Sequence, residues 1–396
     1  MPIPASAPVN TSFSAEVAGH IIRVIPFGPD RLQQLLSMIT GASSSLKLLY
    51  YTFESDICGT QIRDALVEAQ QRGVAVSMLL DSFGSGTTAD AFFDPLRMAG
   101  GTVRWFGTRW TPDYLIRNHQ KMLIADDAAV LSGGFNIGDP YFGDGSSVHD
   151  WRDLGVHITG PQVATMVEMF AMLAHWMDAP RPRFRDLRRI VRRWRGGDAS
   201  RGPVRWLIGG PTPRLSPWTR TLRADMAQAK QMTLTTAYFS PNAGMLRRIG
   251  RIARRGAVTL VLPSHSDNPA TVGAARLLYG FLMKRGVAIF EYEPTRLHNK
   301  LAIIDDIVLI GSSNFDMRSL YMNMELMLRV EDADFAAQCR ALVAAQTGYA
   351  TAMTPALHKA RAGWFTRVRW ALSWLVVNVI DYSVTRRLNF GLADPK

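Results

Sequence analysis

Cysteine is scarce in this chain of 396 residues, and long apolar runs are missing. The two cysteines, Cys58 and Cys339, stand alone in opposite halves, so they form neither a disulfide framework nor a cysteine-rich zinc site. This usage fits a reducing compartment. The longest uncharged apolar stretch, from Trp370 to Ile380, is about half of the roughly 20 residues that cross a bilayer. We therefore expect no transmembrane helix.

The chain also lacks a signal-peptide pattern at its N-terminus and has fewer acidic than basic residues. The N-terminus has no basic segment followed by an apolar run, so we expect no secretory signal peptide. The chain has 45 Lys and Arg but 33 Asp and Glu, which gives a net charge of +12. This excess indicates a polyanionic partner, for which anionic lipid and nucleic acid both qualify. With 47% apolar residues the chain can form a large core, which excludes a disordered chain.

One short pattern, His-x-Lys-x-x-x-x-Asp, occurs twice, about half the chain apart. The first copy contributes His119, Lys121 and Asp126, and the second contributes His298, Lys300 and Asp305. Each copy leads into a turn of small residues that contains Gly134 or Ser312 and ends at Asn136 or Asn314. A duplicated set of His, Lys and Asn is suited to a single phosphodiester-cleaving site, and the duplication makes a chance match improbable.

Both copies lie within a larger repeat of strands and helices. Apolar runs of strand length alternate with helical segments; the expected strands include 48–53, 72–80, 232–239 and 256–262, and the expected helices include 61–69 and 245–254. This alternation predicts β-α-β units, so each half is expected to be an α/β layer structure with a mixed, largely parallel sheet. The Asp pairs 126–127 and 305–306 predict a hairpin after each motif strand.

The remaining segments flank or join the two halves. The expected division is an N-terminal tail (1–24), a first half (25–180), a linker (181–205), a second half (206–350) and a C-terminal segment (351–396). The linker has ten Arg in 25 residues around an apolar stripe, which fits a solvated helix and a membrane-surface helix equally. The C-terminal segment places Trp and Tyr between Arg-rich ends, a pattern that favours membrane-surface binding slightly over a helix docked on the core.

The motif residues fit phosphodiester exchange without a metal or another cofactor. Alternate residues of a strand share a face, so His and Lys of each copy would point to the same side. One imidazole would attack phosphorus and form a covalent intermediate, while the other would donate and then accept a proton. Two Lys and two Asn would hold the non-bridging oxygens, on which charge builds in the transition state. Lys is not a usual metal ligand, and no His/Cys cluster is present.

Each imidazole also needs a carboxylate that orients it through its second ring nitrogen. Asp126 and Asp305 are too far along an extended chain to reach the histidines of their own motifs unless the chain turns back. Asp153 and Glu325, which precede apolar strand-like segments, are better candidates. The other six histidines are expected to be structural or exposed, with His149 and His265 kept in reserve because their loops could border the site.

At these residues the chain resembles the phospholipase D superfamily, and within it the bacterial cardiolipin synthases of that type. The resemblance covers roughly residues 25–350 and is carried by the stretches 118–127, 133–139, 151–153, 158–161, 238–241 and 311–319. It implies two α/β/α sandwich halves, related by a pseudo-twofold axis, that share one active site at their interface. It also implies that His119 is the nucleophile, that His298 is the acid and base, and that Asp153 and Glu325 orient them.

The resemblance assigns the other motif residues as well. Lys121, Lys300, Asn136 and Asn314 would bind phosphate with the turn residues Gly134 and Ser312, and Asp126 and Asp305 would support the motifs from outside the chemistry. The chain lacks the N-terminal transmembrane helices of the long bacterial synthases and looks like the shorter ones. It is expected to act peripherally, on the cytoplasmic side of the inner membrane.

The function implied is phosphatidyl transfer to phosphatidylglycerol, which yields cardiolipin, with an anionic membrane surface as partner. A hydrolytic phospholipase D that releases phosphatidic acid is the near alternative. A nuclease of the same superfamily fits the charge, but the aromatic C-terminal segment disfavours nucleic acid as the partner. A non-enzymatic membrane-binding protein is disfavoured because both motif sets are complete.

Overall fold

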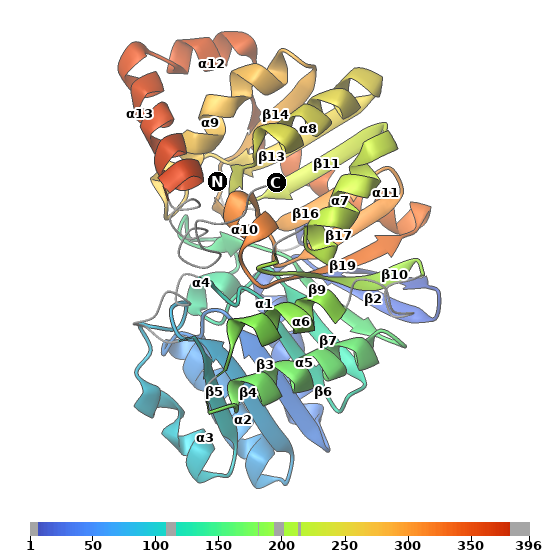
Figure 1. The fold of residues 1–396 in the computed structure, drawn as a ribbon, viewed down its shortest axis with the longest axis vertical. Coiled ribbons are helices and arrows are strands. Elements are labelled where there is room, and N and C mark those ends of the chain that lie inside the picture. Colours follow the sequence, from blue (N-terminus) through green and yellow to red (C-terminus); the bar gives the residue numbers. More distant parts are fainter. Residues whose placement is uncertain (1–6, 108–115, 181, 194–201, 213–214, 381–396) are drawn as a thin grey trace.

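The computed structural model describes residues 7–107, 116–180, 182–193, 202–212 and 215–380 of the chain. Two similar α/β halves stack on each other, with the first half as the lower lobe and the second as the upper lobe of Figure 1. None of the helices in these ranges is both long enough and apolar enough to cross a membrane.

The first half is built on an eight-stranded sheet in the order β1-β2-β9-β7-β6-β3-β4-β5. Its strands are β1 (Phe13–Val17), β2 (His20–Ile25), β3 (Ser45–Tyr50), β4 (Ala75–Asp81), β5 (Thr102–Phe106), β6 (Met122–Ala125), β7 (Ala129–Gly133) and β9 (Gly155–Thr159). Its helices are α1 (Gly28–Gly41), α2 (Ile57–Gln71), α3 (Asp94–Met98), α4 (Asp139–Phe142) and α5 (Val163–Met177).

The second half repeats this arrangement with the order β10-β19-β17-β16-β11-β13-β14-β20. Its strands are β10 (Val204–Gly209), β11 (Gln231–Thr236), β13 (Ala257–Pro263), β14 (Val287–Tyr292), β16 (Lys300–Ile304), β17 (Ile307–Gly311), β19 (Glu325–Glu331) and β20 (Ala350–Ala352). Its helices are α7 (Pro217–Gln228), α8 (Ala243–Arg255), α9 (Pro269–Met283), α10 (Met317–Tyr321) and α11 (Ala333–Thr347). The duplication expected from the motifs therefore extends to the sheets.

The mixed character of the sheets is confirmed, but their parallel part is smaller than expected. Strands β3, β4 and β5 pair in parallel, as do β11, β13 and β14. Every other neighbouring pair in the two sheets is antiparallel. The β-α-β units predicted from the sequence account for these parallel strands. The motif strand then enters the sheet in the opposite direction and is followed by a hairpin, which makes the rest of the sheet antiparallel.

The two hairpins that follow the motif strands are confirmed. Strand β6 pairs with β7, and β16 pairs with β17. The turn residues Asp126, Asp127 and Asp305 have φ values of 50°, 55° and 48°. Asp tolerates this left-handed region better than most residues, because its short side chain hydrogen-bonds locally.

One core cluster joins the two halves. It contains Val24, Ile124 and Val156 from the first sheet together with Ile303 and Val330 from the second. Helices α5 and α11 contribute to the same cluster, while separate clusters lie between each sheet and its outer helices, such as α2 and α8. The two halves therefore form one rigid block, and the segments at their junction are fixed by packing.

Residues 13–24, which were expected in an N-terminal tail (1–24), belong to strands β1 and β2 of the first sheet and the turn between them. The two strands are joined by the tight turn Ala18–Gly19, both with positive φ. The first half therefore begins earlier than residue 25. The sequence signal was weak because Ala occupies a position that hairpins of this kind usually give to Asn or Asp.

The linker contains helix α6 (Phe184–Arg193), which packs against α5. Leu187 and Val191 are fully buried in the shared core, and the Arg side chains 185, 189, 192 and 193 lie on the outside. The apolar stripe of this helix thus covers the protein core rather than a membrane. Residues 194–201 of the linker lie outside the described residues.

The C-terminal segment begins with α12 (Pro355–Arg361) and α13 (Trp364–Trp374), and a π-helical turn extends to Ile380. Helix α13 lies against α9 and buries Trp370 there. Trp364 and Phe365 are 70% and 81% exposed. The helix therefore docks on the core with one side and presents large apolar side chains with the other. Residues 381–396 lie outside the described part.

Candidate active site

His119 is held by the backbone of the opposite half. It lies just before strand β6 rather than on it, which corrects the expectation of a strand mount. The amide of His119 donates to the carbonyl of Met324 at 2.9 Å, and the amide of Met324 donates to the carbonyl of Arg117 at 2.9 Å. These two bonds fix the segment before His119 against the residue that precedes Glu325.

His298 is held in the corresponding way. It follows the short strand β15 (Arg296–Leu297), which pairs in parallel with β8 (Trp151–Arg152) of the first half. The amide of His298 donates to the carbonyl of Arg152 at 2.7 Å. The next residue along the chain from Arg152 is Asp153, so the backbone contact brings a carboxylate beside the imidazole.

The side chains complete a crossed arrangement. His119 Nδ1 lies 3.1 Å from Glu325 Oε2, and His298 Nδ1 lies 2.5 Å from Asp153 Oδ2. Each histidine of one half therefore contacts the carboxylate of the other half. Both carboxylates are fully buried, and the His119 side chain is 12% exposed. The two motifs meet at one place on the interface, where neither half alone contains a complete His–carboxylate pair.

The hydrogen bonds around Glu325 determine the tautomer of His119. The amide of Leu326 donates to Ser312 Oγ at 2.9 Å, so the Ser312 hydroxyl is free to donate to Glu325 Oε2 at 2.5 Å. When Glu325 is ionised, this oxygen also accepts from Nδ1–H of His119, which lies 3.1 Å away. The proton on Nδ1 leaves Nε2 with a free lone pair that faces away from the carboxylate.

The two buried carboxylates differ in the direction of their pKa shifts. It raises the pKa of Glu325 to about 8 despite the nearby ammonium group of Lys121. For Asp153, burial also acts upward, but Lys300, His298 and Arg31 outweigh it and hold the pKa below the usual value. Asp153 is therefore ionised at neutral pH, whereas Glu325 is mostly protonated. His298 faces the stronger negative charge.

The two imidazoles are neutral in the free protein. Burial, followed by the charges of Lys121 and Lys300, lowers the pKa of His119 well below 6.5. Burial and Lys300 lower the pKa of His298 to about 4, against the opposing effect of Asp153. A bound phosphodiester anion would offset the lysine charges and raise both values.

The two motif lysines place positive charge at the same junction, and both are buried. Lys121 Nζ donates to the carbonyl of His119 at 2.7 Å, and Lys300 Nζ donates to the carbonyl of His298 at 2.5 Å. Lys300 Nζ also lies 2.8 Å from His298 Nδ1. Burial lowers the pKa of Lys300 to about 8 and that of Lys121 well below 10.5. Each ammonium group has three donors, so donors are left for an anionic ligand.

The two motif asparagines are both buried but differ in their contacts. Asn136 Nδ2 donates to the Tyr141 hydroxyl at 2.9 Å, and its Oδ1 accepts from the amide of Thr52 at 3.3 Å. Asn314 Oδ1 is buried without a hydrogen-bond partner among the described residues. The duplication is therefore symmetric in residue type but not in hydrogen bonding.

Gly134 and Ser312 occupy equivalent places beside the two carboxylates. A Cβ atom on Gly134 would lie 2.4 Å from Asp153 Oδ1 and 2.9 Å from Lys300 Cδ. In the second half, the Ser312 hydroxyl donates to Glu325 instead. The geometry thus shows both residues against the His-orienting carboxylates.

Asp126 and Asp305 lie at the hairpin turns, away from the histidines. Asp126 accepts from the backbone amides of residues 43–45, and Asp305 accepts from the amides of Lys230 and Gln231. The backbone amides lower the pKa of Asp126 although burial opposes them. Each Asp thus ties the motif hairpin to the start of the neighbouring strand.

Aromatic side chains that sequence reasoning did not assign surround the imidazoles. The Tyr51 ring lies 4.9 Å from the His119 ring, and the Tyr141 and Trp151 rings lie 5.3 Å and 4.9 Å from the His298 ring. These three aromatics line a cavity of about 690 Å³ that also borders on Asp267 and Arg296. Tyr51 lies within the predicted strand 48–53 and Trp151 lies two residues before Asp153, and these positions were the only sequence signal for the aromatic residues.

Arg31 was also missed, because nothing in its helical sequence context marks it. It is fully buried, and its guanidinium donates to the carbonyls of Pro26, Asp153 and Tyr141 at 2.6–2.8 Å. It thereby fixes the backbone at Asp153. Of the two loop histidines that could border the site, His149 contacts Arg296 and His265 contacts Ser264.

Two stacked α/β halves with crossed His–carboxylate pairs and two buried lysines define a phospholipase D-type site. The family described as "Cardiolipin synthase, PLD-like domain" matches residues 35–172 and 222–345, a range that contains both motifs. The chain belongs to this phospholipase D-like cardiolipin synthase family, which confirms the resemblance.

Individual relatives agree with the family. Cardiolipin synthase A of Pseudomonas syringae is 30% identical over 342 residues, which cover 83% of this chain and 69% of that protein. Cardiolipin synthase 1 of Staphylococcus aureus is 32% identical over 325 residues, which cover 79% of this chain and 64% of that protein. The chain thus spans about two thirds of the length of these relatives.

A solved structure agrees with the fold. Phosphatidylserine synthase of Haemophilus influenzae superposes with a TM-score of 0.70 over 96% of this chain and 97% of that chain. The sequence identity is 14%, so this likeness shows the fold alone.

Proposed function

We propose that the protein is a phosphatidyltransferase that makes cardiolipin from a donor phospholipid and phosphatidylglycerol. The observation that carries this proposal is the pair of crossed contacts His119–Glu325 and His298–Asp153 at one interface. Two oriented imidazoles supply the nucleophile and the proton carrier for cleavage of a phosphodiester. The two buried ammonium groups supply positive charge for its non-bridging oxygens. The cardiolipin synthase relatives support the choice of lipid substrate.

In the first step, Nε2 of His119 attacks the phosphorus of the donor. The P–N bond forms as the P–O bond to the headgroup alcohol breaks. His298, which takes up a proton once the bound phosphodiester anion offsets the lysine charges, donates that proton to the departing oxygen. The neutral state of His119 beside a mostly protonated Glu325 supports its role as nucleophile. The ionised Asp153 supports His298 as the proton carrier, because it stabilises the imidazolium.

In the second step, the hydroxyl of phosphatidylglycerol attacks the phosphatidyl-His119 intermediate. His298 takes the hydroxyl proton, the new P–O bond forms and the P–N bond breaks, which restores His119. With phosphatidylglycerol as donor and acceptor, the products are cardiolipin and glycerol. One phosphodiester replaces another, so the reaction needs no external energy source.

Lys121 and Lys300 would stabilise the charge on the non-bridging oxygens in both steps. Their burial makes each charge more effective than it would be in water. Asn136 and Asn314 are both buried, and they would complete the phosphate site by donating from their Nδ2 amide groups. Asp153, Glu325, Gly134 and Ser312 would fix the orientation of the histidines.

The acceptor decides between transferase and hydrolase. Water in place of the lipid alcohol would give phosphatidic acid, which is the alternative function. The aromatic residues Tyr51, Tyr141 and Trp151 beside the histidines favour exclusion of water and hence transfer. They also favour a lipid substrate over a nucleic acid, because the net positive charge of the chain alone would be enough to bind a nucleic acid.

The proposed location is the cytoplasmic side of the inner membrane, with peripheral attachment. The exposed aromatic pair Trp364 and Phe365 on α13 supports contact with the headgroup region of an anionic bilayer. The net charge of +12 supports attraction to the same surface.

Incubation of the purified full chain with phosphatidylglycerol vesicles alone tests the proposal. Cardiolipin and glycerol in equal amounts are the expected products, measured by lipid mass spectrometry and a glycerol assay. The variant His119→Ala is the control and should give neither product. Phosphatidic acid as the main product would establish the hydrolase, and cleavage of DNA without any lipid turnover would overturn the lipid assignment.

A further inference from the structure

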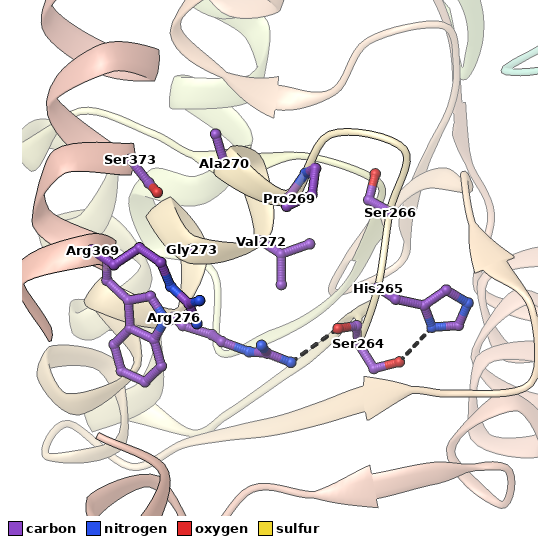
Figure 2. Close-up of a pocket in the computed structure, with 11 residues that line it drawn as sticks. Ser264, His265, Ser266, Pro269, Ala270, Val272, Gly273, Arg276, Arg369 and Ser373 are labelled. Atoms are coloured by element: carbon purple, nitrogen blue, oxygen red, sulfur yellow. Dashed lines mark hydrogen bonds between the residues drawn. The ribbon is translucent and has the colours of Figure 1, made fainter. Parts of the chain in front are cut away.

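A second cavity lies between α9 and α13 and contains none of the motif residues. Its volume is about 340 Å³, within the range of small-molecule sites. It is lined by the loop 264–266, by the first turns of α9 and by Arg369, Trp370 and Ser373 of α13. Figure 2 shows Arg276 and Arg369 at one end of this cavity and His265 at the other.

The cavity has an excess of positive charge. Arg276 and Arg369 line it, and with Arg361 and His358 they also line an adjoining cavity of about 230 Å³. Arg276 binds both oxygens of the buried Glu291 at 2.8 and 2.9 Å, and Arg361 binds the same carboxylate at 3.0 Å. Arg369 forms no ion pair within the described part of the chain. Arg276 and Arg361 share the carboxylate of Glu291, and Arg369 adds a third guanidinium group. These four side chains together have an excess of two positive charges.

Further polar groups point to a ligand with hydrogen-bond acceptors. His265 Nδ1 is 2.9 Å from Ser264 Oγ, and His265 Nε2 is buried without a hydrogen-bond partner among the described residues. Ser264 and Ser266 line the same wall, where the Ser266 hydroxyl donates to Asp267 at 2.7 Å. Two guanidinium groups at one end of the cavity and an unsatisfied ring nitrogen at the other fit an oxygen-rich anion such as a phosphodiester.

The cavity is fixed in shape by a close crossing of the two helices. A Cβ on Gly273 would lie 2.9 Å from Ser373 Oγ and 3.4 Å from Trp370 Cδ1, so α13 lies directly over this glycine. Trp370 is buried at the crossing and its ring stacks on His358 with 5.4 Å between centroids. The cationic wall is therefore held in place by packing and does not depend on exposed side chains alone.

Apolar side chains lie next to the cationic cavity. Trp364, Phe365, Leu372, Leu375 and Val376 are all exposed on α13 and the turn that follows it. A free phosphate would make no favourable contact with this apolar surface, whereas the acyl chains of a phospholipid would cover it. The combination identifies the ligand as a lipid with an anionic headgroup.

We propose that this cavity binds the headgroup phosphate of an anionic phospholipid in the membrane, at a second site distinct from the catalytic one. Arg369 and Arg276 hold the phosphate, and the exposed apolar side of α13 contacts the acyl chains. The loop between β13 and α9 connects this site with the catalytic region, because Asp267 of the loop lines the cavity of Tyr51, Tyr141 and Trp151 and accepts from the Tyr238 hydroxyl at 3.1 Å. A lipid at the second site therefore fixes the catalytic opening against the bilayer.

The test compares Arg369→Gln with Arg367→Gln in the full chain. Arg367 lies on the same helix and loses the same charge, but it lines neither cavity. Binding to vesicles of phosphatidylglycerol and phosphatidylcholine, followed by sedimentation, should weaken about 5-fold or less for Arg367→Gln through general attraction. It should weaken roughly 10-fold or more for Arg369→Gln, which also loses hydrogen bonds to the phosphate.

Three outcomes would overturn the proposal. Equal weakening in both variants would mean diffuse surface charge without a site. Loss of turnover of a monomeric short-chain substrate in Arg369→Gln would mean that the cavity belongs to the catalytic machinery, since the proposal predicts unchanged turnover. Saturable calorimetric binding of inorganic phosphate to the wild type, lost in Arg369→Gln, together with no change in vesicle binding, would assign the cavity to free phosphate.

Discussion

Asp153→Asn is predicted to impair the proton transfer of His298, because the carboxylate and the imidazole come from opposite halves. The contact is short, 2.5 Å from Nδ1 to Oδ2, and both side chains are buried. A buried hydrogen bond to a charged group is worth about 1.5–3 kcal/mol. Loss of the charge with retention of the side-chain shape should therefore slow phosphatidyl transfer about 10- to 150-fold.

The choice of leaving group identifies the step that is affected. Glycerol leaves as a strongly basic alkoxide and needs the proton of His298, whereas p-nitrophenolate leaves without one. We expect Asp153→Asn to slow the first turnover of short-chain phosphatidylglycerol by the full factor, and that of short-chain phosphatidyl-p-nitrophenol only a few-fold. Rapid-quench and stopped-flow measurements of the first turnover give both rates. His298→Ala should show the same dependence on the leaving group.

Glu325→Gln is the matched control, because Glu325 contacts the proposed nucleophile His119 at 3.1 Å. Loss of the Glu325 carboxylate should slow the first turnover of both substrates by a similar factor, since nucleophilic attack is needed with either leaving group. Equal slowing of both substrates by Asp153→Asn, with a dependence on the leaving group in Glu325→Gln, would refute the crossed assignment of roles.

Three further predictions address packing, charge and the membrane surface. Gly134→Ala should lower the free energy of unfolding by about 1–3 kcal/mol in a denaturant titration, because the new Cβ would clash with Asp153, whereas Gly41→Ala, which has open space, should have little effect. Burial lowers the pKa of Lys300 to about 8, so kcat/KM for a short-chain substrate should fall as the pH rises above 8 and this charge is lost; a profile that stays flat to pH 10 would contradict its role. The double variant Trp364→Ser and Phe365→Ser should weaken vesicle binding about 10-fold without a change in short-chain turnover, and equal loss of both would mean that α13 acts within the core.

Much of the site could be predicted from sequence because the motif residues are local and duplicated. The spacing of His119, Lys121 and Asp126 recurs at His298, and this recurrence alone indicates a shared site. The reach of an extended chain was enough to direct attention from Asp126 to Asp153. The hairpins were predictable because Asp tolerates the left-handed turn.

The crossed pairing could not be predicted from local patterns. It depends on backbone hydrogen bonds from His119 to Met324 and from His298 to Arg152, which exist only once the halves are packed. The position of Arg31 could not be predicted for the same reason, because two of its carbonyl partners, Asp153 and Tyr141, lie more than 100 residues away along the chain. Long-range contacts of this sort leave no periodic signal in the sequence, and the same is true of the antiparallel pairing beside the β-α-β units.

The central claim is that two imidazoles from opposite halves serve one phosphorus atom, with His119 as the covalent carrier. Acid quenching of the enzyme during turnover of phosphatidylglycerol, followed by proteolysis and mass spectrometry, tests it most directly. A phosphatidyl or phosphate adduct on His119 is the predicted result. An adduct on His298, or full turnover in the variant His119→Ala, would contradict it.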